Sequence, residues 1–201
     1  IGFRVPEVVF FNLDEAFGRT EADEEIQDLL QNSRGLNLGL HFLSGAFTFD
    51  PVAVNVDART ASGIVWLDAF LTNVDRTVQN PNMLMWYREL WLIDHGASLL
   101  FHHSWVSWKE QALSPFAFIK NHVLLPNATD LAGADKEFKE ILTPEKIDQI
   151  VGLIPDDWLH WAEEGESTED LRQVYRDFLT ERLHNSEIFV KEAENARKAL
   201  I

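Results

Sequence analysis

The sequence predicts an α+β fold, with a small sheet-bearing portion over residues 1–50 and a mainly helical portion over residues 51–201. Three observations predict this division. Strand-like runs of β-branched and aromatic residues occur before residue 50, an almost wholly apolar helical segment covers residues 58–71, and strong helix starts stand at Thr143 and Ser167.

The first portion contains two predicted strands around one predicted helix. Residues 5–11 and 36–49 are rich in β-branched, aromatic or alternating apolar residues, and Ser44-Gly45 interrupts the second run. Residues 21–31 are acidic with apolar residues on one side, which is typical of a surface helix. Because the strand pattern begins almost at Ile1, we expect further residues to precede it.

The middle of the chain pairs a buried helix with a polar loop. Residues 58–71 leave almost no polar face, so this helix should lie inside a domain. The loop at residues 73–82 is polar and turn-forming, and a function can explain such a loop directly after a buried helix. Two short apolar runs within residues 83–93 then predict a β-hairpin that ends at Asp94.

The remainder of the chain has helical patterns. Thr143 followed by Pro144 predicts a helix start, and Ser167 with Asp170 resembles a capping box, so one or two long helices should close the chain. The aromatic run at residues 101–108 is typical of core packing, and the acidic stretch at residues 156–170 is typical of a solvated face.

Composition restricts the function classes. The 201 residues are 46% hydrophobic, with seven Trp and 14 Phe, which is enough for one substantial core. The net charge of −16 disfavours a nucleic-acid partner, because phosphate backbones bind clustered Lys and Arg. No apolar run approaches the roughly 18 residues of a membrane helix, so we expect no membrane partner. The absence of cysteine excludes disulfides and thiolate-held metals and fits a cytoplasmic location.

Three polar residues carry the predicted chemistry. Phosphoryl transfer from Mg-ATP needs a carboxylate that takes the acceptor's proton and oxygen ligands for the metal ion. Asp75 and Asn80 are five residues apart, the spacing of the Asp and Asn in a kinase catalytic loop. Asp94 follows the predicted hairpin in an Asp-x-Gly segment, where kinases place a second metal ligand.

Each of these residues also has a structural interpretation. Asp and Asn populate turns because their side chains bond the local backbone, so the loop could be a plain polar turn. Asn82 is a fallback metal ligand, and Asn73 is expected to cap the helix or hold the loop rather than touch substrate. Arg76 could bind a substrate or phosphate, or equally hold the loop. Asp68, on the buried helix, is expected to brace the loop, because a buried carboxylate needs partners.

At these residues the chain resembles the bacterial HipA-like kinases and, more distantly, the phosphatidylinositol 4-kinases. The shared features are an Asn-x-Asp-Arg loop at residues 73–76, the following Asn80, and Ile-Asp-x-Gly at residues 93–96. The resemblance extends over nearly the whole chain. It implies a protein-kinase-like fold, with part of the N-terminal lobe and the hinge in residues 1–50 and the helical catalytic lobe in residues 51–201.

The resemblance also implies roles for individual residues. Asp75 would be the catalytic base, and Asn80 and Asp94 would bind magnesium. Adenine would pack against the hinge formed by Phe42, Leu43, Ser44, Gly45 and Ala46. ATP would donate its γ-phosphoryl group to a hydroxyl, with a protein Ser or Thr as the leading acceptor and a small molecule or lipid headgroup as the alternative.

One feature departs from the kinase pattern. Kinases hold the ATP phosphates with a Lys on an early strand, but no Lys precedes Lys109 in this chain. Residues before Ile1 would have to supply it, or the chain is a catalytically inactive nucleotide-binding or scaffold module. Nucleotidyl transfer on the same fold is a further alternative, and an antitoxin-regulated toxin role is known in the wider family.

Three histidines invite a transition-metal interpretation. His102 and His103 are adjacent, so they cannot share one face of a strand, and no carboxylate stands at the usual short spacing from them or from His95. We therefore do not predict a zinc site.

Overall fold

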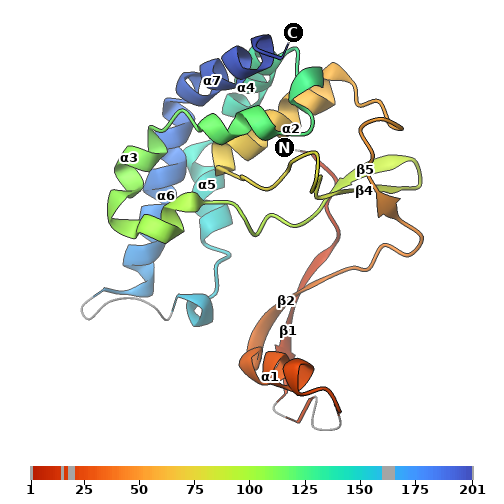
Figure 1. Ribbon diagram of the computed structural model, residues 1–201. Helices are drawn as coiled ribbons and strands as arrows, with labels where there is room; N and C mark the ends of the chain where they lie inside the picture. The colour runs from red at the N-terminus through yellow and green to blue at the C-terminus, as the bar shows by residue number, and fades with distance from the viewer. Residues whose placement is uncertain (1, 15, 18–20, 160–165, 201) are drawn as a thin grey trace.

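The computed structural model describes residues 2–14, 16–17, 21–159 and 166–200 and has a mixed α+β architecture (Figure 1). Two small antiparallel sheets occupy the first half of the chain, and helices make up most of the second half. The mixed class predicted from the sequence is therefore confirmed.

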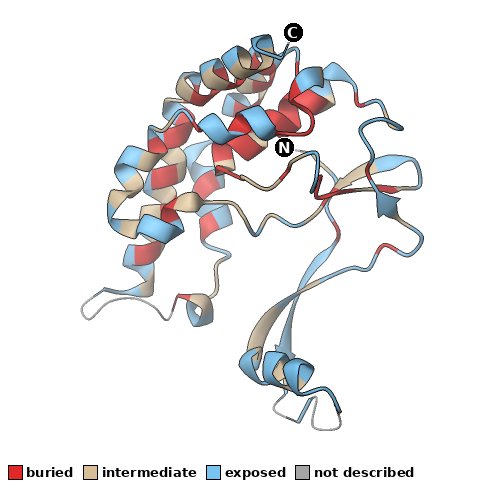
Figure 2. Cartoon of the chain, viewed as in Figure 1, coloured by how far each residue is buried: buried red, intermediate tan, exposed pale blue. Residues whose placement is uncertain are grey.

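The first sheet forms an arm that projects from the helical body (Figure 1). It pairs β1 (Val8–Leu13) with β2 (Gly35–Leu40), with Val8 opposite Leu40, and α1 (Glu24–Asn32) lies between them in the chain. Two strands around a surface helix were predicted, and α1 indeed has no buried residue (Figure 2).

The boundaries of these strands differ from the prediction. β1 begins three residues later than expected, and the run predicted over residues 36–49 stops at Leu40. Residues 41–46 form turns instead, in which Gly45 has a φ of 80° and the Ala46 amide donates to the Leu43 carbonyl over 3.1 Å. A positive φ favours Gly and ends strand pairing at this point.

The second sheet has the strand order β3 (Phe47–Thr48), β4 (Met83–Trp86) and β5 (Glu89–Leu92). β4 and β5 form the predicted hairpin, with Met83 opposite Leu92. Tyr87 and Arg88 at its turn both have positive φ values, 47° and 66°, as a two-residue hairpin with a type I′ turn requires.

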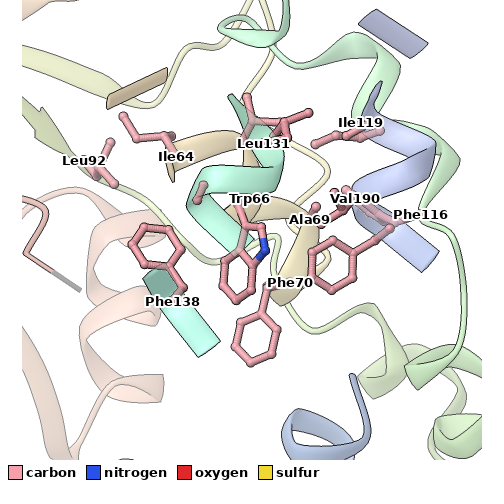
Figure 3. Close-up of a cluster of buried hydrophobic side chains, with 14 of the residues drawn as sticks. Ile64, Trp66, Ala69, Phe70, Leu92, Phe116, Ile119, Leu131, Phe138 and Val190 are labelled. Carbon is pink, nitrogen blue, oxygen red and sulfur yellow. The ribbon is translucent and has the colours of Figure 1, made fainter. Parts of the chain in front are cut away.

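Helix α2 (Ala58–Leu71) lies inside the helical body, as its apolar sequence predicts (Figure 2). The Asp57 carboxylate caps it by accepting from the Thr60 amide over 3.0 Å. Trp66 on α2 has no exposed surface, and its ring stacks on Phe70 and lies edge-on to Phe138 and Phe189 (Figure 3). This aromatic cluster anchors the helix that leads into the polar loop.

The longer of the remaining helices are α4 (Leu131–Ile141), α5 (Pro144–Val151), α6 (Thr168–His184) and α7 (Glu187–Lys198), together with the short α3 (Trp108–Ala112). Of these helices, α4, α6 and α7 pack against α2, and α3 and α5 pack against α6. The 3₁₀ segments are η1 (Leu100–Ser107), η2 (Ala117–Asn121), η3 (Leu125–Asn127) and η4 (Asp156–Trp158). Both predicted helix starts are confirmed, since Thr143 caps α5 and Ser167 forms a capping box with Asp170 on α6.

Two further expectations have mixed outcomes. In the aromatic run at residues 101–108, Phe101 is buried but Val106 is 94% exposed, so only part of the run contributes to the core. The acidic stretch at residues 156–170 lies partly outside the described residues. Within the described parts of the chain, no helix has the length and apolar character needed to cross a membrane.

Candidate active site

The candidate loop begins where α2 ends. Thr72 adopts a left-handed conformation with a φ of 55°, which terminates the helix. The amide of Leu99 donates to the Leu71 carbonyl over 2.7 Å, and the amide of Leu100 donates to the Thr72 hydroxyl over 3.0 Å. The segment that follows Asp94 therefore satisfies polar groups at the end of α2, which a helix end needs when it is buried.

The inner side of the loop is a buried polar cluster around Asp68. Its carboxylate accepts from Arg76 Nε over 2.5 Å, from Asn73 Nδ2 over 2.9 Å and from His122 Nε2 over 2.9 Å. The side chains of Asp68 and Arg76 have no exposed surface. Burial raises the pKa of Asp68, but the hydrogen bond from His122 and the hydrogen bond and positive charge of Arg76 outweigh it and lower the pKa to about 2.

His122 extends the cluster to a distant part of the chain. The Leu124 amide donates to His122 Nδ1 over 3.0 Å, so Nε2 carries the proton and donates to Asp68. Backbone contacts also join the loop to the segment around His122. Thr77 and His122 form an isolated antiparallel β-bridge, and the Val123 amide donates to the Arg76 carbonyl over 3.1 Å. His122 was not predicted, because nothing local marks a residue 54 positions from its partner.

Arg76 makes only internal contacts among the described residues. Besides Asp68, it donates through Nη1 to the carbonyl of Asn82. It is 1% exposed, so its guanidinium joins the start of the loop to its end. Of the two roles weighed from the sequence, these contacts match the one in which Arg76 holds the loop.

The outer side of the loop carries Asp75. Asp75 Oδ2 accepts from Asn80 Nδ2 over 2.6 Å and from Asn82 Nδ2 over 3.2 Å. The Asp75 amide donates to Asn73 Oδ1 over 3.2 Å, so Asn73 holds the loop as expected. Asp75 is half-buried and Asn80 is exposed, in contrast to the sealed cluster on the inner side.

Asp94 lies on a segment that is hydrogen-bonded to this loop on both sides. The amide of Ile93 donates to the Asn82 carbonyl over 3.0 Å, and the amide of Val74 donates to the Ala97 carbonyl over 3.3 Å. Asp94 is exposed and has a φ of 48°, and its Oδ1 accepts from the Gly96 amide over 3.2 Å. Two segments about 20 residues apart in sequence thus run together, one with Asp75 and Asn80 and the other with Asp94.

His95, next to Asp94, lies close enough to the inner cluster to be affected by its charges. Burial is the main cause that lowers the pKa of His95, and the positive charge of Arg76 lowers it further. The negative charges of Asp68 and Asp94 oppose this lowering without reversing it. Among the described residues no group of three or more His, Asp or Glu side chains is placed to hold a metal ion.

The oxygens on the outer side suit a hard divalent cation. Magnesium takes one or two carboxylates from protein and completes its shell with amide, water or phosphate oxygens. Asn80 donates its NH₂ group to Asp75, which leaves its Oδ1 as a possible ligand, and the hydrogen bond found for Asp94 uses Oδ1 and leaves Oδ2. One carboxylate oxygen of Asp94 and the amide oxygen of Asn80 therefore suit magnesium better than zinc.

The segment predicted as an adenine-binding hinge lies against the hairpin. The Ser44 carbonyl accepts from Trp86 Nε1 over 2.9 Å. Leu43 is 6% exposed and packs inward, whereas Phe42 is 83% exposed. The segment therefore forms a turn between the arm and β3.

A cavity of about 520 Å³ borders the loop on the side of η2. Thr77, Val78 and Gln79 form its wall on the loop, and Lys120, Asn121, His122, Val123, Pro126 and Leu200 form the rest. Asp75, Asn80 and Asp94 do not line this cavity, whereas His122 of the inner cluster does.

Comparison with known families identifies the family of this chain. A family model described as HipA-like kinase matches residues 1–191. Comparisons with curated proteins and with solved structures returned no match. The family match extends over most of the chain and includes both segments of the candidate site. The resemblance inferred from residues 73–76, Asn80 and residues 93–96 is thereby confirmed, and the chain belongs to the HipA-like kinase family.

Proposed function

We propose that this chain transfers the γ-phosphoryl group of ATP to a hydroxyl, with Asp75 as the catalytic base and Asn80 and Asp94 as metal ligands. Family membership supports a kinase-type phosphotransferase that uses ATP. The observation that supports the more specific proposal is the difference between the two sides of the loop at residues 73–82. On its inner side, Asp68 forms a buried ion pair with Arg76, and on its outer side Asp75 lies on a stretch of chain that is hydrogen-bonded to the Asp94 segment.

Asp75 is suited to take a proton from the acceptor. Two amide groups, from Asn80 and Asn82, donate to its Oδ2 and fix the orientation of the carboxylate. Its Oδ1 is then the oxygen that accepts the proton of the acceptor hydroxyl. The acceptor oxygen bonds to the γ-phosphorus, the bond from that phosphorus to the β–γ bridging oxygen breaks, and the electron pair stays on ADP.

In this proposal, Asn80 and Asp94 hold a cation at the phosphates. A magnesium ion held there would neutralise charge on the phosphate oxygens during transfer. The Gly96 amide donates to Asp94 Oδ1 and orients that carboxylate, as the second shell of a metal site does. Asn82 is the fallback ligand in place of Asn80.

A protein Ser or Thr is the leading acceptor of the phosphoryl group. A small-molecule or lipid hydroxyl is the alternative, which a panel of acceptors would distinguish.

One observation favours a second function, a nucleotide-binding or scaffold module without catalysis. No Lys precedes Lys109, so the described N-terminal strands carry no ammonium group for the ATP phosphates. Such a module would bind ATP through the same oxygens but would not turn it over.

Turnover of labelled ATP separates these functions. The full protein would be incubated with MgCl₂ and either γ-labelled or α-labelled ATP, and release of phosphate and labelling of the protein would be followed. Asp75→Asn is the test variant, and Asp28→Asn is its matched control, since Asp28 is exposed on α1 far from the loop. Binding of Mg-ATP would be measured by calorimetry in parallel.

The expected result is turnover of the γ label that falls about 10²–10⁴-fold in Asp75→Asn and is unchanged in Asp28→Asn. Binding of ATP without turnover would support the module instead. Transfer of the α label to the acceptor would show that the reaction is nucleotidyl transfer and not phosphoryl transfer. Equal turnover in Asp75→Asn and Asp28→Asn would show that Asp75 has no part in the mechanism.

A further inference from the structure

Arg182 on α6 is a buried cation whose burial follows from the helix pattern. The core-facing stripe of α6 carries Leu171, Tyr175, Phe178 and Arg182, at spacings of four, three and four residues. Three of these positions hold apolar or aromatic residues and the fourth holds an arginine with no exposed surface. A buried charge is retained only when its hydrogen-bond donors are satisfied.

Carbonyl oxygens satisfy the guanidinium of Arg182. Nε donates to Phe70 over 2.9 Å, and Nη2 donates to Ala69 over 2.6 Å. Nη1 donates to the carbonyls of Ala112 over 3.0 Å, Ser114 over 2.9 Å and Gln111 over 3.4 Å. The guanidinium also lies over the Phe189 ring, 4.8 Å from its centroid. Where the chain is described, no carboxylate lies within ion-pair distance of Arg182.

These carbonyls belong to the ends of two helices. Ala69 and Phe70 lie in the last turn of α2, and Gln111, Ala112 and Ser114 lie at or just after the end of α3. The carboxyl end of a helix carries unpaired carbonyls and a partial negative charge, which a cation compensates. Burial lowers the pKa of Arg182 to about 9, so it remains charged at pH 7.

The end of α2 directly precedes the candidate loop, whereas the end of α3 follows the Asp94 segment only after η1. α2 leads within four residues from Leu71 to Asp75, and the chain from Asp94 runs through η1 into α3. The loop and the Asp94 segment also share direct hydrogen bonds, such as that between Val74 and Ala97. Arg182 adds a second connection, between the helix that precedes the loop and the helix that follows the Asp94 segment, from a part of the chain that is remote in sequence.

We infer that Arg182 is a positioning residue that holds the end of α2 and the α3 segment together, and thereby keeps Asp75 and Asp94 in register. This inference rests on the proposed function for its effect on turnover. A shift of about 1 Å at a catalytic group reduces turnover about 100-fold, so loosening this connection should lower kcat. The affinity for ATP, which depends on other contacts as well, should change less.

The test compares Arg182→Lys and Arg182→Met with Leu171→Ala. The Lys variant keeps the charge but cannot reach both helix ends with one ammonium group, and the Met variant removes the charge. Leu171 lies on the same stripe of α6, is 1% exposed, and is not a partner of Arg182, so Leu171→Ala reports general destabilisation. All measurements are made well below each variant's Tm, after circular dichroism has shown that it is folded.

Two readouts are recorded. For kinetics, Arg182→Lys should lower kcat about 10- to 100-fold with KM for ATP within about threefold of wild type, and Leu171→Ala should leave kcat of the folded protein unchanged. For hydrogen exchange, Arg182→Lys should increase the exchange of amides in residues 73–82 and 94–100 together, whereas Leu171→Ala should not.

Hydrogen exchange keeps the test independent of catalysis. If wild type transfers no phosphoryl group but Arg182→Lys loosens both segments, the proposed function fails and the positioning role stands. If exchange in Arg182→Lys is unchanged or rises in only one segment, the inference is overturned. A kcat loss in Leu171→Ala equal to that in Arg182→Lys would also overturn it. If Arg182→Met does not fold, the Lys variant decides.

Discussion

The two sides of the 68–82 region differ in burial and in what their side chains touch. On the inner side, the side chains of Asp68 and Arg76 have no exposed surface and form an ion pair. The Asp68 carboxylate also accepts hydrogen bonds from Asn73 and His122. On the outer side, Asp75 is half-buried and Asn80 and Asp94 are exposed. One side of the loop thus maintains its shape, and the other leaves oxygens available for a ligand.

This difference implies that the two sides should respond differently to mutation. Removal of an inner residue leaves a buried charge without its partner and should destabilise the fold. Removal of an outer residue should affect chemistry and leave stability nearly unchanged. The following predictions test that separation, in order of decreasing effect.

The largest effect is expected for Asp68→Ala. This change leaves the buried Arg76 and His122 without their shared acceptor, and we expect the free energy of unfolding to fall by about 3–5 kcal/mol. Urea denaturation monitored by circular dichroism would measure it. Asp75→Ala is the matched control and should change stability by no more than about 0.5 kcal/mol. Equal losses in the two variants would contradict the division of the loop.

The next effect concerns Asp94 and turnover. Asp94→Asn removes the negative charge but keeps a residue that tolerates a φ of 48°, so the backbone should persist. We expect γ-phosphoryl turnover to fall at least about 100-fold, because a charged metal ligand is lost, with stability within about 0.5 kcal/mol of wild type. Unchanged turnover over a titration of MgCl₂ would exclude Asp94 as a ligand.

The third prediction uses pH. The pKa of Asp68 falls from 3.8 to about 2 on folding, because His122 and Arg76 outweigh the effect of burial. The carboxylate therefore stabilises the fold above pH 4, and this contribution is lost as the pH falls from about 4 to 2. A lowering of this size is worth about 2 kcal/mol.

Acid denaturation of two variants isolates this contribution. Asp75→Asn should retain the loss of stability between pH 4 and 2, since the inner cluster is intact. Asp68→Asn should lack it and be less stable than wild type at pH 7. If the free energy of unfolding fell equally between pH 4 and 2 in wild type and in Asp68→Asn, the Asp68 carboxylate would not be the cause of the acid sensitivity.

The smallest effect distinguishes the two asparagines that contact Asp75. Asn80 is exposed, so Asn80→Ala should raise the half-saturating Mg²⁺ concentration about 10-fold with little change in stability. Asn82 is 8% exposed with a φ of 46°, so Asn82→Ala should cost about 1 kcal/mol of stability and leave the Mg²⁺ requirement unchanged. The reverse pattern would make Asn82 the ligand.

The local elements were predictable because their causes are local. Apolar composition over residues 58–71 predicted the buried helix, Thr143-Pro144 and Ser167 predicted two helix starts, and the short apolar runs predicted the hairpin before Asp94. In the run predicted over residues 36–49, the interruption at Ser44-Gly45 is present, but strand pairing already ends at Leu40, because the alternation that continues through residues 41–43 has no partner strand among the described residues.

The sequence by itself determined the buried helix, the hairpin, two helix starts, the motif of Asp75, Asn80 and Asp94, and through that motif the family. These depend on side chains near one another in the chain. Only the tertiary structure decided that His122 completes the Asp68 cluster from 54 residues away and that Arg182 bonds Ala69 across 113 residues. Such pairs are chosen by which buried donor and acceptor the packing brings within hydrogen-bond distance, and no local pattern encodes that choice.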